Sequence, residues 1–211
     1  MYARDAWRET RPEVLKAAIR ARRFATLVVA GPRPEPVHLP VALVEDEAGL
    51  RLEGHVARAN PIWRALPAEA LAMVLCADAY VRPGWYPSKA ETGKAVPTWL
   101  YVAIHLRGAL TPRTAPAWLR AHVARLSEEG EAGRPEPWSA SDAPEDYMAA
   151  MLRGIVGVSL AVREIEGVWK MNQHHAAENR NGVAAGLAKA PDPGAAAAAA
   201  VMHALEDTRD R

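Results

Sequence analysis

The chain has 211 residues, of which 50% are hydrophobic and 24% are charged. This composition is typical of a globular protein and excludes wholesale disorder. The 26 basic residues nearly balance the 25 acidic ones, and the formal net charge of +1 does not favour direct DNA binding, which needs a concentrated basic surface. A single cysteine excludes an internal disulfide framework and a cysteine-based zinc site.

Charged residues, Pro or Gly interrupt every apolar run before it reaches the ~20 residues of a membrane-spanning helix. The first residues contain no apolar segment of the kind found in secretory signals. With no disulfide framework, the reduced cytoplasm is the expected location, and we expect no membrane partner.

The first third of the chain predicts one helix followed by short strands. Apolar residues at i, i+4 spacing predict a helix over 12–23. Apolar or alternating runs then predict strands over 24–30, 37–44 and 50–56. The last two are separated by a polar break typical of a hairpin. Asn60-Pro61 predicts the start of a short helix, because Asn caps a helix and Pro fits its first position.

The rest of the chain returns to strands and ends in helices. The predicted strands are 71–80, 98–111 and 156–165, and the predicted helices are 117–129, 145–152 and two stretches after residue 176. Segment 82–96, rich in Pro, Gly, Ser and Lys, predicts a long loop, and such loops are often functional. Strands joined by short turns, with helices at both ends and one in the middle, predict an α+β fold on an antiparallel sheet or barrel.

The strand predicted over 98–111 has two chemically different faces. Its even-numbered residues from 100 to 106 are all aliphatic and predict a core face. The opposite face carries Trp99, Tyr101, His105 and Arg107, which suits a planar ligand or a partner subunit. The alternative interpretation is an ordinary solvated sheet face.

Two segments could bind an anion. Arg58 follows a predicted strand and precedes the helix start at Asn60, so its guanidinium and free backbone N–H groups could bind a phosphate. The alternative is a surface arginine beside a plain helix cap. In the loop, Trp85 and Tyr86 could cover a flat ring while Lys89 and Lys94 neutralise a phosphate. The alternative there is a surface loop with its rings in the core.

Several sequence blocks occur in an order that resembles a known family. They are His38-Leu-Pro40, Gly54-His-Val-Ala-Arg-Ala-Asn-Pro61 with Trp63, Ala79-Tyr-Val with Trp85-Tyr-Pro-Ser-Lys89, Gly93-Lys94 with Val96-Pro-Thr-Trp99, Pro137-Trp138 with Asp142-Ala-Pro144, and Met151-Leu with Ile155-Val-Gly157. From about Trp7 to Leu187 the chain is similar to the PaiB family of FMN-binding negative transcriptional regulators. The resemblance implies an antiparallel split β-barrel of the pyridoxamine-phosphate-oxidase type, a homodimer, and FMN at the subunit interface.

The resemblance extends to domains and to site residues. It implies an FMN-binding split-barrel domain over 1–190, with an N-terminal helix, and a C-terminal helical tail over 191–211. The residues it assigns to FMN binding are His55, Arg58, Asn60, Tyr80, Trp85, Tyr86, Lys89, Lys94, Thr98, Trp99, Tyr101, Lys170 and Gln173. No catalytic residue is identified. We expect a transcriptional regulator that acts indirectly; the alternatives are an NAD(P)H-using flavin oxidoreductase with an unknown small substrate and a dimer without cofactor.

The chain departs from the family pattern at a few positions. Leu100 replaces the Asn of a Trp-Asn-Tyr motif, Arg82 and Gly84 stand where serines are expected, and Asn172 replaces the Ser of a Lys-x-Ser-Gln-Asn motif. These departures bear on whether FMN is retained. His174-His175, with His38, His55 and His105, could suggest a metal or haem site, but adjacent histidines point in different directions and no carboxylate completes a set, so we expect no metal.

Overall fold

The computed structural model of the protein describes residues 1–207. The strands are β1 (Arg8–Glu9), β2 (Phe24–Val29), β3 (Glu35–Asp46), β4 (Gly49–Ala57), β5 (Ala68–Val81), β6 (Thr98–Arg113) and β7 (Ile155–Lys170). The α-helices are α1 (Pro12–Arg22), α2 (Ser88–Thr92), α3 (Pro116–Glu131), α4 (Glu145–Arg153), α5 (Ala177–Leu187) and α6 (Ala195–Asp207). Short 3-10 turns are η1 (Asp5–Trp7), η2 (Pro61–Ala65) and η3 (Pro83–Trp85).

The strands follow the order β1-β7-β4-β3-β2-β5-β6, and β7 also pairs with β6. This second pairing closes a ring of six strands, to which the two-residue β1 adds an edge. The β3–β4 hairpin turns tightly, since Asp46 pairs with Gly49 across the register. The predicted α+β fold on an antiparallel barrel is therefore confirmed.

The predicted elements occur at their expected places, with two corrections. Segment 82–96 is not a continuous loop, because η3 and α2 interrupt it. Strand β7 continues to Lys170 instead of ending near residue 165, and its extension pairs Gly167 and Val168 with β1. That pairing partner lies about 160 residues earlier in the chain, so the local pattern gave no indication of it.

The alternation of β6 decides which of its faces is buried. Leu100, Ile104 and Leu106 are completely buried, whereas Trp99 keeps 55% of its surface exposed. The predicted core face is confirmed, and Leu100 belongs to it. The family departure at residue 100 therefore changes a core side chain.

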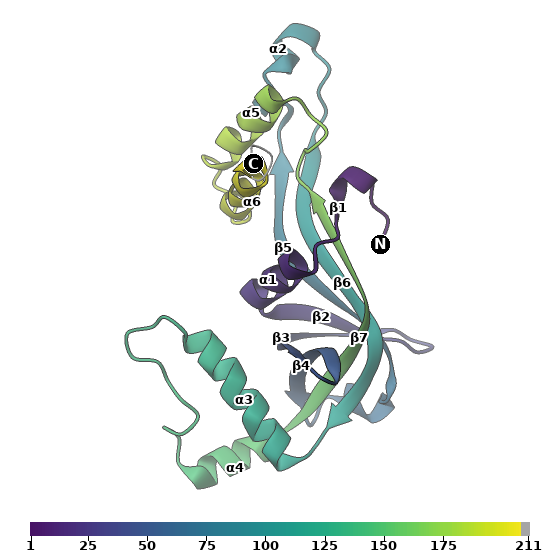
Figure 1. The fold of residues 1–211 in the computed structure, drawn as a ribbon, viewed down its shortest axis with the longest axis vertical. Coiled ribbons are helices and arrows are strands. Elements are labelled where there is room, and N and C mark those ends of the chain that lie inside the picture. Colours follow the sequence, from purple (N-terminus) through teal and green to yellow (C-terminus); the bar gives the residue numbers. More distant parts are fainter. Residues whose placement is uncertain (208–211) are drawn as a thin grey trace. The chain divides into compact units, whose positions relative to one another are not determined.

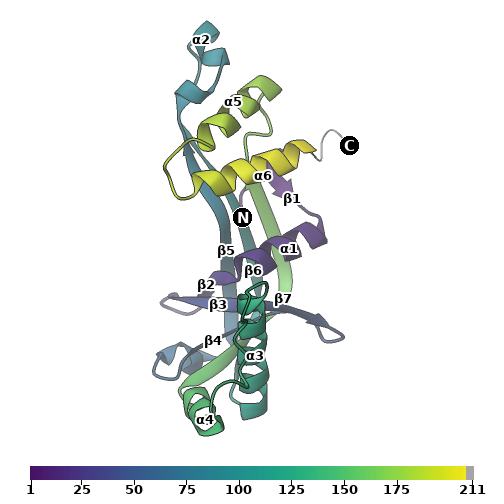
Figure 2. The ribbon, with the colours of Figure 1, turned by 90° about the vertical axis from the view of Figure 1, so that its left-hand side faces the viewer.

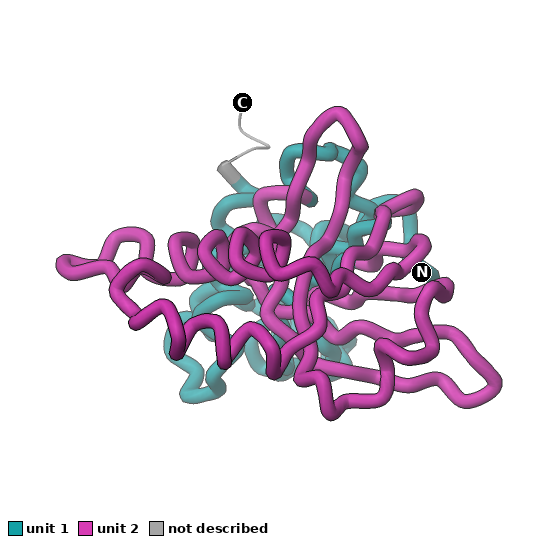
Figure 3. Tube along the Cα trace, turned by 90° about the horizontal axis from the view of Figure 1, so that it is seen from below, with its two compact units in different colours: residues 1–15, 75–104, 166–211 teal, residues 16–74, 105–165 magenta. Residues whose placement is uncertain are grey.

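The contacts divide the chain into two compact units, coloured separately in Figure 3. The first unit contains residues 1–15, 75–104 and 166 onward, and the second contains residues 16–74 and 105–165. Strands β5, β6 and β7 each contribute to both units. No helix over residues 1–207 is long and apolar enough to cross a membrane.

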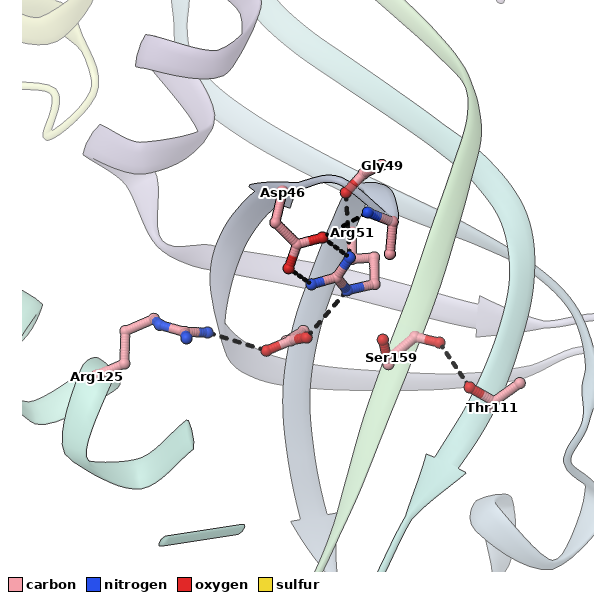
Figure 4. A network of polar contacts seen from close by, with 8 residues as sticks. Asp46, Gly49, Arg51, Thr111, Arg125 and Ser159 are labelled. Carbon is pink, nitrogen blue, oxygen red and sulfur yellow. Dashed lines mark hydrogen bonds and ion pairs between the residues drawn. The ribbon is translucent and has the colours of Figure 1, made fainter. Parts of the chain in front are cut away.

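In the second unit, the start of α3 packs against α4 (Figure 1). Leu119, Met148 and Leu152 form their shared apolar core. A polar network connects α3 to the β3–β4 hairpin (Figure 4). Arg125 of α3 and Arg51 of β4 both contact the buried Glu53, at 3.1 and 3.4 Å. The carboxylate thus has two cationic partners, as a buried charge requires.

In the first unit, α5 and α6 lie against each other (Figure 2). The alanine-rich α6 buries Ala195, Ala198, Ala199 and Met202, and Arg180 of α5 forms a two-bond ion pair with Glu206. Helix α5, the start of β6 and the end of β7 contribute to the cavity described next.

Candidate functional site

The first unit contains a cavity of about 350 Å³, a volume within the range of small-molecule sites. Its lining comes from the N-terminal segment, the β5–β6 connection, the start of β6, the end of β7 and α5. The lining residues are Arg4, Trp7, Tyr86, Ser88, Lys94, Ala95, Val96, Thr98, Lys170, Asn172, His174, His175 and Asn179. We call this space the cationic cavity.

The charge of the cationic cavity is uniformly positive. Arg4, Lys94 and Lys170 contribute three cations, and the lining contains no Asp or Glu. Over residues 1–207, no ion pair joins these three side chains to a carboxylate. Lys170 donates a hydrogen bond to the Thr98 hydroxyl at 3.2 Å, which leaves its charge uncompensated. Uncompensated cations that line one space favour an anionic ligand.

Trp7 lies close to two of these cations. The Arg4 guanidinium is 5.1 Å and the Lys170 ammonium 5.5 Å from the centre of its ring system, within the range of cation–π contacts. The indole Nε1 is buried and has no hydrogen-bond partner in the described part of the chain. A buried N–H without an acceptor is unusual, since it forfeits its bonds to water. Trp7 therefore offers a free donor at the cavity.

Two adjacent histidines form part of the wall. The His174 and His175 rings are 4.2 Å apart, and they also contact Trp7 and Tyr86 respectively. Burial lowers the pKa of His175, and burial together with the proximity of His175, Arg4 and Lys170 lowers the pKa of His174. Both rings are thus neutral at pH 7 and present flat polar surfaces.

A hydrogen bond joins two buried side chains that line the cavity, Asn172 and Tyr86. Asn172 donates from Nδ2 to the Tyr86 hydroxyl at 3.1 Å, and burial raises the pKa of that hydroxyl. Asn172 has a φ of 59°, a left-handed conformation that Asn adopts more readily than most residues. Asn172 stands where the family motif has Ser. Its amide donates the hydrogen bond to Tyr86, and its left-handed backbone conformation favours Asn over Ser.

Four of the sequence-predicted residues line the cationic cavity: Tyr86, Lys94, Thr98 and Lys170. Six others belong to the same unit without lining it: Tyr80, Trp85, Lys89, Trp99, Tyr101 and Gln173. Tyr101 lies 5.7 Å from the Lys170 ammonium, and Gln173 accepts from the Met171 backbone N–H at 2.8 Å. Trp85 packs closely on α5 at Gly186, since a Cβ added to that glycine would lie 2.4 Å from the Trp85 ring. Contact of these six with FMN stays a prediction.

His55, Arg58 and Asn60 belong to the second unit. Arg58 donates to the backbone carbonyls of Arg153 and Ile155 at 2.7 and 3.0 Å, so its guanidinium has a structural role at the start of β7. The Asn60 side chain accepts from the Ile62 N–H and caps η2, as the sequence predicts. Their predicted contact with FMN also stays a prediction.

Several lining residues were not predicted from the sequence. Arg4 and Trp7 precede every periodic element, and Asn179 lies on α5, outside the family blocks. Asn179 donates to the Ser88 hydroxyl at 3.0 Å and thereby joins α5 to α2. Only the concentration of Trp in the chain could have drawn attention to Trp7. Over residues 1–207, no group of three or more His, Cys, Asp or Glu side chains is placed to hold a metal ion.

Comparison with solved structures identifies the fold. The FAD and heme binding protein from Mycobacterium smegmatis superposes with a TM-score of 0.60 at 19% identity, covering 85% of this chain and 80% of that one. The flavocytochrome Anf3 from Azotobacter vinelandii superposes with a TM-score of 0.55 at 15% identity, covering 80% and 72%. At such identities these likenesses concern the fold alone, which is the split barrel of flavin-binding proteins.

Sequence comparison identifies the family. An uncharacterized protein of Aspergillus fumigatus is 31% identical over 90% of this chain and 91% of its own length. The "Protease synthase and sporulation protein PAI 2" of Bacillus subtilis is 27% identical over 82% and 83%. A family described as "Putative FMN-binding domain" matches residues 1–164. The chain therefore belongs to this FMN-binding domain family, and the relation to PaiB indicated by its motifs is confirmed.

Proposed function

We propose that the protein binds FMN in the cationic cavity, with Arg4, Lys94 and Lys170 at the phosphate. The observation that carries the proposal is the charge of the wall, which has three cations and no carboxylate. A phosphate monoester carries nearly two negative charges at pH 7 and forms strong charge-assisted hydrogen bonds with Arg and Lys. The family to which the chain belongs supports this choice of anion.

The remaining walls fit a flat heterocycle. Trp7, Tyr86, His174 and His175 supply rings, and the unpartnered indole N–H of Trp7 can donate to a ring carbonyl or a phosphate oxygen. The Asn172–Tyr86 bond holds one of these rings in place. When bound, FMN supplies hydride and single-electron transfer, and the protein supplies orientation and charge.

The proposal extends to a homodimer. Trp99 and Tyr80 lie on the outer face of β6 and β5, with ring centres 6.0 Å apart, and they are 55% and 41% exposed. Exposed aromatic side chains in contact with each other are typical of the centre of a subunit interface. Sedimentation equilibrium of wild type and of Trp99→Glu tests this assignment. A wild-type dimer that the variant dissociates supports it, and a wild-type monomer contradicts it.

The cellular role we propose is regulation through flavin chemistry, without direct contact with DNA. The formal net charge of +1 supports an indirect role, since direct binding needs a basic surface. A gel shift that weakens steeply with salt would contradict it. The alternative is a flavin oxidoreductase that uses NAD(P)H, and rapid NAD(P)H oxidation by the FMN-loaded protein would favour that alternative.

FMN binding is tested by titrating the purified protein with FMN and following flavin and tryptophan fluorescence. We expect saturation at one FMN per chain, with competition by millimolar inorganic phosphate because the phosphate subsite is shared. A titration without saturation would contradict the proposal. Saturation that phosphate leaves unchanged would contradict the assignment of the three cations.

A further inference from the structure

A second cavity lies under the C-terminal half of α3, in the second unit. The N-terminal half of the helix packs closely on the sheet. Trp118 covers Gly157, and a Cβ added to this glycine would lie 2.1 Å from the indole. His122 is buried. The C-terminal half encloses about 340 Å³, which we call the α3 cavity. Its lining residues are Arg23, Pro40, His55, Val123, Leu126, Ser127 and Gly130.

The walls of the α3 cavity combine apolar surface with one cation. Pro40, Val123 and Leu126 supply the apolar part, and the lining contains no Asp or Glu. Val123 and Leu126 are only partly buried, so the helix leaves apolar surface that no side chain of the described chain covers fully. An apolar pocket with a few polar groups is the usual form of a small-molecule site.

Arg23 occupies a position at which glycine would be the easier residue. It follows α1 with a φ of 51°, the left-handed conformation that is unfavourable for a residue with a Cβ. One guanidinium nitrogen donates to the Glu129 backbone carbonyl near the end of α3. Four of its five N–H groups remain for other acceptors, since guanidinium carries five donors. The arginine is thus held at the cavity with donors to spare.

The second polar group is His55. Its contact with His122 determines which of its two ring nitrogens carries the proton. His55 Nδ1 and His122 Nε2 are 3.2 Å apart, and His122 stacks on Trp118. His122 Nδ1 is buried without a hydrogen-bond partner in the described chain, so a proton there would be an orphan donor. The neutral ring therefore carries its proton on Nε2 and donates to His55. His55 in turn carries its proton on Nε2, which makes it a donor for a ligand.

We propose that the α3 cavity binds a small apolar monocarboxylate, with the carboxylate at Arg23 and His55 and the apolar part against Pro40, Val123 and Leu126. A guanidinium and a neutral imidazole N–H complement one carboxylate, and the Ser127 hydroxyl can provide a further donor. The proposal gives His55 to this ligand in place of FMN, to which the resemblance assigns it, because none of these residues lines the cationic cavity.

The test is calorimetric titration with octanoate, and 1-octanol serves as the uncharged ligand of the same chain length. We expect one octanoate per chain, bound at least tenfold more tightly than octanol, with the same affinity in the presence and absence of FMN. Equal affinity for the two ligands, or many weak sites, would overturn the proposal. Displacement of octanoate by FMN would also overturn it, since the α3 cavity would then belong to the flavin site.

The variant Arg23→Gly removes the cation and keeps the fold, because glycine adopts the left-handed conformation without strain. We expect it to weaken octanoate binding about tenfold or more and to leave octanol unchanged. Arg20→Ala, at an exposed position of α1, is the matched control and should bind like wild type. Leu126→Trp fills the cavity and should abolish binding of both ligands. Octanoate affinity that neither Arg23→Gly nor Leu126→Trp changes would contradict the assignment.

Discussion

The cationic cavity and the α3 cavity have nearly the same volume, about 350 and 340 Å³, but their walls differ in chemistry. The cationic cavity has three cations, four rings and several polar side chains, whereas the α3 cavity has aliphatic walls with one arginine and one histidine. Volume alone therefore says little about a ligand. The number of uncompensated charges and the apolar area decide which anion each cavity suits.

Trp7, in the cationic cavity, and His122, beside the α3 cavity, each have a buried ring nitrogen without a hydrogen-bond partner over residues 1–207. The two nitrogens differ in whether they must carry a proton. Trp7 Nε1 is an obligatory donor in a residue that lines its cavity. His122 Nδ1 can remain unprotonated, as an acceptor without a donor. His122 does not line the α3 cavity, but it contacts His55 and thereby determines which nitrogen of His55 carries the proton. We propose that the first nitrogen contacts the flavin and that the second positions the proton of His55.

The largest effect is expected for Lys170→Ala. This variant removes one of three cations from the cationic cavity and should weaken FMN binding about 10- to 100-fold, as expected for a charge-assisted hydrogen bond. Fluorescence titration with FMN measures the change. Lys189→Ala is the control, since Lys189 is exposed, belongs to the same unit and does not line the cavity. Equal losses in both variants would mean that the general charge of this surface, and not the cavity, attracts FMN.

The second prediction concerns pH and the α3 region. Burial, with the nearby charges of His55 and Arg125, lowers the pKa of His122 to about 4, against about 6.5 in an unfolded chain. Between these values the unfolded state binds a proton that the folded state does not. The free energy of unfolding should therefore fall as pH decreases from 6.5 toward 4, by at most about 1.4 kcal/mol per pH unit from this group.

Urea unfolding of wild type and His122→Phe at several pH values measures that slope. The variant keeps a buried ring and lacks the titrating nitrogen, so its stability should change less over the same range. Identical slopes for the two proteins would show that His122 does not stay neutral in the folded state.

The sequence predicted the barrel better than the site, and particular residues explain why. The alternation of β6 is local, so Leu100 and Trp99 could be assigned to opposite faces from their spacing alone. The cationic cavity joins Arg4, Lys94 and Lys170 from three distant segments, and no local pattern predicts that Arg4 and Trp7 contribute. The path of β7 to Lys170 likewise depends on pairing with β1.

A smaller effect on stability is expected at Asn172. Asn172→Ser restores the family residue, loses the amide bond to Tyr86, and places a less suitable residue at a φ of 59°. We expect a loss of about 1 kcal/mol in the free energy of unfolding. Asn172→Gly separates the two causes, because glycine loses the hydrogen bond but tolerates the conformation. A serine variant as stable as wild type would contradict both causes.

The smallest effect is expected for Trp7→Phe, which keeps an aromatic ring and removes the buried N–H. If that N–H donates to FMN, the affinity should fall about 2- to 10-fold, the usual range for one neutral hydrogen bond. The stability of the protein without FMN should not decrease, because Nε1 has no partner over residues 1–207. Unchanged FMN affinity would place the flavin away from Trp7.

The central claim is that the cationic cavity selects FMN by its phosphate. Parallel titrations of wild-type protein with FMN and with riboflavin, which has the same ring system and no phosphate, test this claim most directly. We predict saturable binding of FMN at one per chain and at least 100-fold weaker binding of riboflavin, since three cations line the cavity. Equal affinity for the two flavins, or no binding of either, would contradict it.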